Sequence, residues 1–550
     1  MEQESRKSVI MQAGILASAS IIVRIIGLLY RAPLTAVIGD EGNGYYGFAY
    51  NIYTIILMIS SYSVPSALSK IMAQKLAQGQ YRNAQRVFHA ALVYNMAVGV
   101  FFGLIMFFGA SWLVPPNSVS VLRVFAPTIF LFGILGAFRG YYQAQGTMVQ
   151  TSVSQILEQI ANAVVSIGAA ALLIHLVADQ DATTKARYGA MGSALGTGSG
   201  VLIALLFMGW TYYLNRPYYL RKVASDRTEY EESFSHVMRE TILVITPFIL
   251  SSFILNLTTA LNQTVYSKIM IGARNYDEAI ISTLYGIFSN KAVVITNIPI
   301  SIATAFSAAI IPGIASAHAQ GKREDTRRRA LDAKRMTLLI AIPSAGGLIA
   351  LARPITMLLF PQPASLPMAS RLLAMLAVTV VFYSISTVTN AVLQSIGRMS
   401  LPLVSASAAL AVQTIVLVVL IRYTKLSVYA LVIVSILYSI LIFLLNEFFL
   451  HRYLRVQDDV INMYAKPIAA ALIMGSMAFS VYHLCSWILQ KIGMKREYFI
   501  NLVAVIPALI VAVLVYFFIL IRSGALTEGE ILQLPKGQSM VRILRRLRWI

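Results

Sequence analysis

The sequence predicts an all-α polytopic membrane protein with about fourteen transmembrane helices, on three observations. Of its 550 residues 58% are hydrophobic and only 12% are charged, with a mean hydropathy of +0.71. Soluble globular chains carry about 25% charged residues. Apolar runs of the roughly 20 residues that a helix needs to cross a bilayer recur along the whole chain. These runs are far longer than the ten-residue alternation of a membrane β-barrel, so strands are not expected.

Each apolar run is taken as one predicted helix. In chain order the runs cover residues 10–32, 44–68, 85–113, 121–142, 149–177, 188–214, 241–268, 283–311, 334–352, 370–395, 400–421, 427–450, 465–489 and 498–521. They group into two six-helix lobes followed by two further helices. The predicted domains are an N-terminal lobe, an amphipathic cytoplasmic linker, a C-terminal lobe, the two extra helices and a basic cytoplasmic tail, at 1–214, 215–240, 241–450, 451–522 and 523–550.

Two pairs of similar segments predict that the lobes are repeats. "SVPSALSKIMAQKLAQG", from Ser63, and "IIPGIASAHAQG", from Ile310, both run from an apolar residue and Pro through a helix end to Gly. "YYQAQGTM" at 141–148 likewise resembles "AVLQSIGRM" at 391–399. Six helices per lobe is an even number, so both lobes share one orientation about an axis along the membrane normal. Such repeats are typical of transporters, although a purely structural duplication is the alternative.

The net charge of +21 does not indicate a nucleic-acid partner. With both termini in the cytoplasm, the cytoplasmic loops and termini collect 29 of the 44 Lys and Arg and the outer loops collect 12. This asymmetry is the positive-inside bias of membrane proteins. The tail "VRILRRLRWI" at 541–550 is basic and amphipathic, which favours a helix lying on an anionic leaflet over a partner-binding helix.

Three cations remain once the loops are counted: Arg24, Arg31 and Lys291. Arg24 and Arg31 are seven residues apart, so a single helix places them on nearly one face, about 10 Å apart along its axis. A charge at the centre of a membrane helix costs at least about 2.5–3.5 kcal/mol, so such residues normally face a water-filled interior. Snorkelling to an interface is the alternative for Arg31 and Lys291.

The acids inside the apolar runs are fewer than the cations. Glu158 lies well within a run and is a candidate counter-ion, proton carrier or packing carboxylate, whereas Glu447 lies at a helix end and is assigned to the interface. The predicted cavity is therefore net positive and suits an anion, with Arg being well matched to phosphate. Further cavity or coupling candidates, for which helix–helix hydrogen bonding is an equal alternative, are Asn256, Asn262, Gln263 and Asn290.

No catalytic, metal or cofactor site can be identified. The Gly-rich "GAMGSALGTGSG" at 189–200 lies in an apolar helix with Gly every fourth residue, which indicates close helix packing rather than a phosphate loop. The sequence contains no GxxxxGK[ST] or HExxH motif, and its six His are scattered. Its one Cys allows no intrachain disulfide. We expect that the protein is not an enzyme and that it binds no metal ion and no cofactor.

Four stretches carry a family resemblance: "VRIIGLLYRAPLTAVIGDEGNGYYGFAYNIYTI" (23–55), "FRGYYQAQGTMVQTSVSQILEQI" (138–160), "NKAVVITNIPISIATAFSAAIIPGIA" (290–315) and "VTNAVLQSIGRMSLPLVS" (388–405). They resemble the lipid-linked oligosaccharide and polysaccharide flippases of the multidrug/oligosaccharidyl-lipid/polysaccharide (MOP) exporter superfamily. The chain is most similar to the branch of the stage V sporulation protein B-like proteins and the Gram-positive lipid II flippases.

The resemblance implies two bundles around a cationic cavity for a polyprenyl-pyrophosphate headgroup, served by Arg24 and Lys291. The resemblance implies that an arginine at the position of Arg31 is present in only part of the branch. It also implies that Glu158 corresponds to a glutamate of the family. Some relatives carry an aspartate where this chain has Asn262, so the chain departs from a coupling-cation site built on that carboxylate. Coupling to membrane potential, H+ or Na+ stays open.

The expected function is a flippase that moves a lipid-linked cell-wall precursor, with lipid II first, across the bacterial cytoplasmic membrane by alternating access. Its partners would be the lipid-linked saccharide, membrane lipids and cell-wall synthesis proteins, in vegetative growth or sporulation. The alternatives are a small-molecule exporter of the same superfamily and a non-transporting scaffold of cell-wall synthesis.

Overall fold

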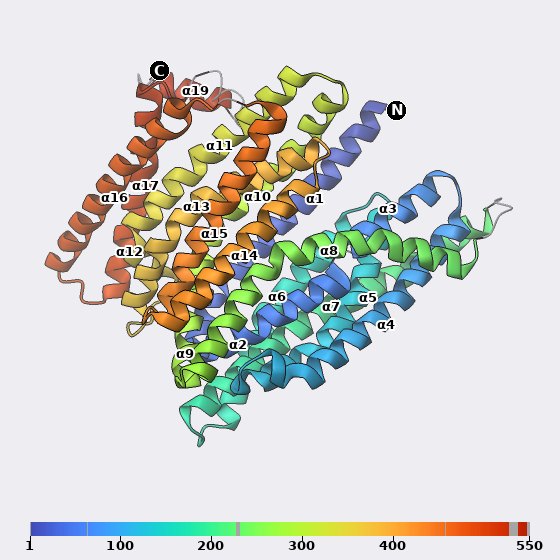
Figure 1. Cartoon of the computed structure of the whole chain (residues 1–550), viewed down its shortest axis with the longest axis horizontal. Helices are drawn as coiled ribbons and strands as arrows, with labels where there is room; N and C mark the ends of the chain where they lie inside the picture. Colours follow the sequence, from blue (N-terminus) through green and yellow to red (C-terminus); the bar gives the residue numbers. More distant parts are fainter. Residues whose placement is uncertain are drawn as a thin grey trace. The chain divides into compact units, whose positions relative to one another are not determined.

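The computed structural model describes residues 2–62, 64–226, 232–456, 458–526, 528 and 537–546, and these ranges are helical apart from short connections (Figure 1). The predicted all-α class is confirmed. Contacts divide the chain into two compact units, Met1–Gly286 and Ile287–Ile550. This division falls later than the linker 215–240, in which the sequence places the lobe boundary, and the predicted lobe limits stay a prediction.

Unit 1 is built from long helices with short π-helical and 3-10 turns between some of them. Its elements are α1 (Glu2–Leu29), α2 (Arg31–Leu57), η1 (Met58–Tyr62), α3 (Val64–Ala77), α4 (Tyr81–Leu113), η2 (Pro116–Ser118), α5 (Val119–Ala144), α6 (Val149–Leu176), α7 (Ala182–Ala224), α8 (Phe234–Ser267), η3 (Lys268–Ala273) and α9 (Glu278–Gly286).

Unit 2 begins in a π-helical turn that leads directly into a long helix. Its elements are η4 (Ile287–Ala292), α10 (Val293–Ala319), α11 (Arg323–Ala350), α12 (Ala352–Leu359), α13 (Leu366–Ser395), α14 (Ser400–Tyr423), α15 (Val428–Leu454), η5 (Ile461–Ala465), α16 (Lys466–Lys491), α17 (Glu497–Arg522) and α19 (Gly537–Arg546).

Twelve spans in the described residues are long and apolar enough to cross a membrane. They coincide with twelve of the fourteen predicted runs. The other two runs fall on α1 and α8, parts of whose side chains lie outside the described residues. The chain is therefore a multi-pass membrane protein, and the total of fourteen stays a prediction.

The first two predicted helices are joined differently from expectation. The sequence ends one helix at 32 and begins the next at 44, but α2 already begins at Arg31. Tyr30 separates α1 from α2 while keeping right-handed helical dihedral angles. The change of direction comes at Gly39, whose φ of 69° and ψ of 179° interrupt α2. Glycine reaches this positive φ without the steric cost that a Cβ would impose.

Small residues let α6 and α7 pack backbone to backbone in unit 1. A Cβ added to Gly192, Gly196 or Gly200 of α7 would lie 2.6 Å or less from backbone atoms of α6. The predicted close packing by the 189–200 stretch is thus confirmed. A Cβ on Gly200 would lie 2.5 Å from the carbonyl oxygen of Glu158, so this close packing also involves the part of α6 that carries the intramembrane acid.

The paired segments that predict a repeat share the same backbone turns. Gly79 and Gly321, in the first pair, have φ values of 75° and 71°. Gly146 and Gly397, in the second pair, have φ values of 76° and 79°. The left-handed turns explain why glycine occupies all four positions. They support the predicted repeat, which stays a prediction for the chain as a whole.

At one side of unit 2, α16 and α17 form a hairpin that packs on α11 and α12 (Figure 1). The short α19 belongs to the same cluster, because Val541 is buried with Leu520 and Leu526. Its Arg542, Arg545 and Arg546 are exposed. The basic face of this helix is therefore turned outward, as the predicted membrane-surface role requires, and that role stays a prediction.

Candidate functional site

Arg31 lies at the start of α2, half-buried and eight residues before the kink at Gly39. Its guanidinium is close enough to the phenol groups of Tyr46 and Tyr50 for electrostatic interaction. No carboxylate in the described part of the chain forms a salt bridge with it. Arg31 therefore keeps its positive charge on a tyrosine-lined part of unit 1.

Glu158 of α6 is paired with Arg139 of α5. An Nη atom of Arg139 lies 2.7 Å from Oε2 of Glu158, and its Nε donates to the Ser154 hydroxyl at 3.0 Å. The Arg139 side chain is 7% exposed and that of Glu158 is 25% exposed. Of the three roles predicted for Glu158, the structure supports the counter-ion, but its partner is Arg139 rather than Arg24, Arg31 or Lys291.

A row of neutral polar groups joins three helices of unit 1. Tyr46 of α2 and Thr197 of α7 bring their hydroxyls within 3.4 Å. Thr197 donates to the Asn162 side chain of α6 at 3.5 Å, and Ser166 donates to the same amide oxygen at 2.9 Å. Hydroxyl and amide groups of this kind suit the polar part of a ligand without adding charge.

Arg24 lies on α1 with its side chain exposed. One turn later, Gly27 lets this helix approach α6, where a Cβ would lie 3.2 Å from the Gln159 amide. The helix carrying Arg24 thus packs on the helix carrying Glu158, but the Arg139 pair does not include Arg24. The sequence argument that groups Arg24 with Arg31 stays a prediction.

Lys291 belongs to unit 2, in the π-helical turn η4, and is 1% exposed. Its Nζ donates to Oγ of Ser365 at 2.6 Å and lies 6.0 Å from the ring centre of Phe360. The neighbouring Asn290 is half-buried. A π-helical turn inserts an extra residue into the helical ladder and is frequent at functional sites.

Gln263 of α8 is buried in a hydrogen-bonded contact with other helices of unit 1. Its Oε1 accepts from Asn51 at 2.6 Å and from Tyr285 at 3.2 Å, and its Nε2 donates to the Phe48 carbonyl at 2.6 Å. Gln263 thus takes part in helix–helix hydrogen bonding, the alternative to a cavity or coupling role that the sequence left open. The adjacent Asn262 is half-buried, and the side chain of Asn256 lies outside the described residues.

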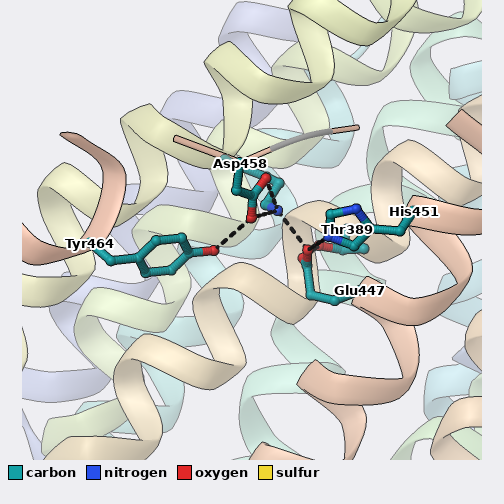
Figure 2. A network of polar contacts seen from close by, with 6 residues as sticks. Thr389, Glu447, His451, Asp458 and Tyr464 are labelled. Atoms are coloured by element: carbon teal, nitrogen blue, oxygen red, sulfur yellow. Dashed lines mark hydrogen bonds and ion pairs between the residues drawn. The ribbon is translucent and has the colours of Figure 1, made fainter. Parts of the chain in front are cut away.

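Unit 2 contains a second buried ion cluster, centred on Lys334 of α11. Its ammonium, 0% exposed, lies 2.6 Å from Glu447 Oε2 and 2.7 Å from Asp458 Oδ2. Thr389 donates to Glu447 at 3.0 Å and Tyr464 donates to Asp458 at 3.0 Å. Figure 2 shows these side chains converging from separate helices and from the segment before η5. Glu447, which the sequence argument assigned to the interface because it lies near a helix end, is thus buried in an ion cluster.

The Lys334 cluster also includes three potential metal donors: Glu447, His451 and Asp458. His451 Nε2 lies 3.7 Å from Glu447 Oε2. The ammonium of Lys334 lies against both carboxylates, the place that a metal ion between them would take. We therefore interpret this cluster as an internal ion pair that fastens helices of unit 2.

Sequence reasoning missed Arg139 and Lys334 because the loop count placed both with the cytoplasmic cations. Each lies at the edge of an apolar run, where sequence alone does not separate an interfacial cation from a buried one. A usable signal was an acid inside an apolar run: Glu158 in the run after that of Arg139, and Glu447 three runs after that of Lys334. Unpaired buried acids are costly, so each predicts a cation within reach.

Long apolar helices that enclose ion pairs and bring an uncompensated arginine to a polar face are features of the membrane transporter class. Residues 9–318 match the family described as polysaccharide biosynthesis protein, and residues 289–420 match the MatE family. The chain belongs to the polysaccharide biosynthesis protein family and, with it, to the MOP superfamily.

Two relatives from Bacillus subtilis (strain 168) are similar to the chain. The lipid II flippase MurJ is 22% identical over 422 residues, which cover 74% of this chain and 76% of that protein. Stage V sporulation protein B is 24% identical over 331 residues, covering 59% and 61%. The family to which the resemblance pointed is thus confirmed.

Solved structures share the fold. A structure of lipid II flippase MurJ in an inward closed conformation has a TM-score of 0.64 at 14% identity, covering 92% of this chain and 97% of that chain. An inward-facing multidrug resistance MATE family transporter of the MOP superfamily has a TM-score of 0.59 at 16% identity, covering 78% and 95%.

Proposed function

We propose that this protein is a flippase for a polyprenyl-pyrophosphate-linked saccharide precursor of the cell wall, with lipid II as the first candidate. The precursor would cross the bacterial cytoplasmic membrane by alternating access, with its prenyl tail remaining in lipid. The family membership and the names of the two Bacillus relatives support this class of cargo.

The observation that carries the proposal is the pairing of Glu158 with Arg139. Because that acid is already neutralised, it does not cancel the charge of Arg31, and the polar face of unit 1 stays positive. A positive site in a low-dielectric surrounding attracts an anion strongly. Arginine matches pyrophosphate through several parallel donors, and the hydroxyl row from Tyr46 to Asn162 suits a sugar.

The orientation and energy source are part of the proposal. We place both termini in the cytoplasm, as the positive-inside bias indicates. Membrane potential, a proton or Na+ would drive transport, without any bound cofactor. In liposomes containing the purified protein, valinomycin with a K+ gradient isolates potential, and imposed pH or Na+ gradients isolate the ions.

Complementation tests the function directly. A bacterium depleted of its lipid II flippase would receive the wild-type chain or the variants Arg24→Ala, Arg31→Gln and Lys291→Gln. Arg123→Gln is the matched control, because this exposed arginine of α5 donates only to the Phe107 carbonyl. Membrane levels of every variant are measured by immunoblot.

We expect rescue by the wild type and by Arg123→Gln, and at least a tenfold loss of viable count for Arg31→Gln and Lys291→Gln. Equal rescue by every charge variant would contradict the cationic-site proposal and support the scaffold alternative. A well-expressed wild type that fails to rescue would contradict lipid II as the cargo.

A second candidate, export of small molecules, is favoured by the MatE match at 289–420. Organic cations would require a site of the opposite charge, which the uncompensated Arg31 does not provide. Drug susceptibility of an efflux-deficient strain separates the two functions. Protection that persists in Arg31→Gln would support the exporter over the flippase.

A further inference from the structure

Unit 1 contains a cavity of about 500 Å³ that is separate from the Arg31 face. It lies between the end of α3, the start of α4, the turn after α5 and the end of α7. These segments carry the predicted cytoplasmic loops. Its size is within the roughly 300–1,000 Å³ of small-molecule sites.

An aromatic cluster forms one wall of the cavity. Tyr141 is 2% exposed and lies edge-on to Tyr219 and Tyr212, with ring centres 5.3 and 5.4 Å apart. Phe88 supports Tyr141 from a ring-centre distance of 4.6 Å. The rings fix one another, so they present a preformed surface rather than one that collapses on itself.

The cavity has one charged residue, Lys222 of α7. Its Nζ lies 4.7 Å from the ring centre of Tyr218 and 5.8 Å from that of Tyr81. None of the described acids pairs with Lys222, whereas Lys75 of the nearby α3 is paired with Glu232. Lys222 places its own positive charge against the Tyr218 and Tyr81 rings, which disfavours a second cation there, so the cavity favours an anion.

Two side-chain amides complete the polar lining. Gln145 hydrogen-bonds with the hydroxyls of Tyr141 and Tyr219, and Gln85 donates to the Tyr212 hydroxyl at 3.1 Å. Amides and phenols both donate and accept, as a polyhydroxyl ligand requires. Aromatic faces offer flat apolar area for the C–H face of a sugar ring.

We propose that this cavity binds the phosphate-bearing saccharide headgroup of the cargo on the predicted cytoplasmic side, before the headgroup reaches Arg31. Lys222 contacts the phosphate and Tyr218 packs on a sugar ring. Gln85 and Gln145 form hydrogen bonds with the hydroxyl groups of the sugar. This inference rests on the proposed function and adds a first docking site to it.

Binding to the full-length protein in uncharged phosphatidylcholine nanodiscs tests the proposal. The probe is a short-chain lipid-linked disaccharide pyrophosphate, followed by microscale thermophoresis. The variants are Lys222→Gln and Tyr218→Ala. Their matched controls on the same helix are Arg221→Gln and Tyr213→Ala, which are exposed and do not line the cavity.

We expect the two cavity variants to weaken binding at least tenfold and the two controls to leave it unchanged. Uridine diphosphate N-acetylglucosamine, a soluble phosphosugar, should compete at higher concentration, and phosphatidylglycerol should not. Binding by both cavity variants equal to that of wild type would overturn the proposal. Equal competition by phosphatidylglycerol would also overturn it, since the site would then recognise phosphate without sugar.

A parallel flipping assay in liposomes separates this inference from the proposed function. Transport by the wild type, with normal headgroup binding by Lys222→Gln and Tyr218→Ala, would overturn the docking site alone. Lys222-dependent binding without any transport would support the docking site and contradict the flippase function.

Discussion

The Arg139–Glu158 pair of unit 1 and the Lys334 cluster of unit 2 neutralise buried charge in different ways. Arg139 meets one acid, whose side chain is 25% exposed. Lys334 meets two acids with side chains 10% and 13% exposed, and both acids have further hydroxyl partners. The first pair borders the polar face that carries Arg31, and the second is enclosed by helices.

The difference indicates separate roles for the two clusters. A lysine between two carboxylates is held from several sides and fastens the helices that supply them. An arginine that meets one partly exposed acid leaves that acid open to a competing cation. We therefore interpret the Lys334 cluster as structural, and we interpret the Arg139–Glu158 pair as the contact that controls the charge of the polar face carrying Arg31.

The predicted repeat sharpens this contrast. With Gly146 aligned on Gly397, Arg139 falls on Asn390 of α13. Asn390 accepts a hydrogen bond from Asn446 at 2.8 Å, a neutral contact. Two segments of similar sequence and turn geometry thus carry a charged pair in one unit and an amide pair in the other.

The largest expected effect is on the stability of unit 2. Lys334→Met leaves Glu447 and Asp458 buried without their cation, which should cost about 3–5 kcal/mol in the free energy of unfolding. Thermal unfolding in detergent measures it. The triple variant Lys334→Met/Glu447→Gln/Asp458→Asn should recover much of the loss. A single variant as stable as wild type would remove the structural interpretation.

A smaller loss should follow from displacing α6, which carries Glu158. Gly200→Ala places a Cβ 2.5 Å from the Glu158 carbonyl, an overpacking that costs about 1–3 kcal/mol. Gly168→Ala on α6 is the control, because its Cβ meets nothing within 4 Å. The control should keep or slightly raise the melting temperature, since alanine is the better helix former. Equal destabilisation by both would contradict the packing argument.

If the Arg139–Glu158 pair controls the charge of the polar face, breaking the pair should change the rate of transport. Arg139→Gln frees Glu158 to attract Arg31, and we expect a roughly tenfold slower flipping rate, equivalent to about 1.4 kcal/mol in the barrier. Arg139→Gln/Glu158→Gln should restore the rate, because the unpaired acid is then gone. A double variant as slow as the single one would show that Arg139 acts through something other than charge balance.

The smallest effect concerns one loop aspartate in each unit. Hydrogen bonds from Thr184 and from Asn462 lower the pKa values of Asp181 and Asp459. A lowered folded-state pKa adds stability that is fully present above the ordinary value of about 3.9 and is lost as pH falls through the folded value. The contribution of both groups to thermal stability should therefore be constant between pH 5 and 8, with no pH dependence from either group in that range. A change in that window that disappears in Asp181→Asn or Asp459→Asn would contradict the assignment.

Several helices could be predicted because the sequence signal is local. The apolar runs place twelve spans, and the Gly spacing at 189–200 predicts close helix packing by this stretch, although not which helix it packs against. Both depend on composition and helical periodicity alone. The boundary between α1 and α2 could not be predicted in the same way, since the helical backbone continues past Pro33 and changes direction only at Gly39.

The sequence alone determined the all-α membrane class, the family and the presence of charges inside apolar helices, because burial in lipid demands long apolar helices. Tertiary structure alone decided which partner each of these charges has. Glu158 lies with Arg139, Lys334 lies with Glu447 and Asp458, and Lys291 lies with Ser365. The physical reason is that these partners come from different helices or from segments far apart in the chain. The distance between partners depends on how those segments pack, and the hydropathy of the sequence does not predict that packing.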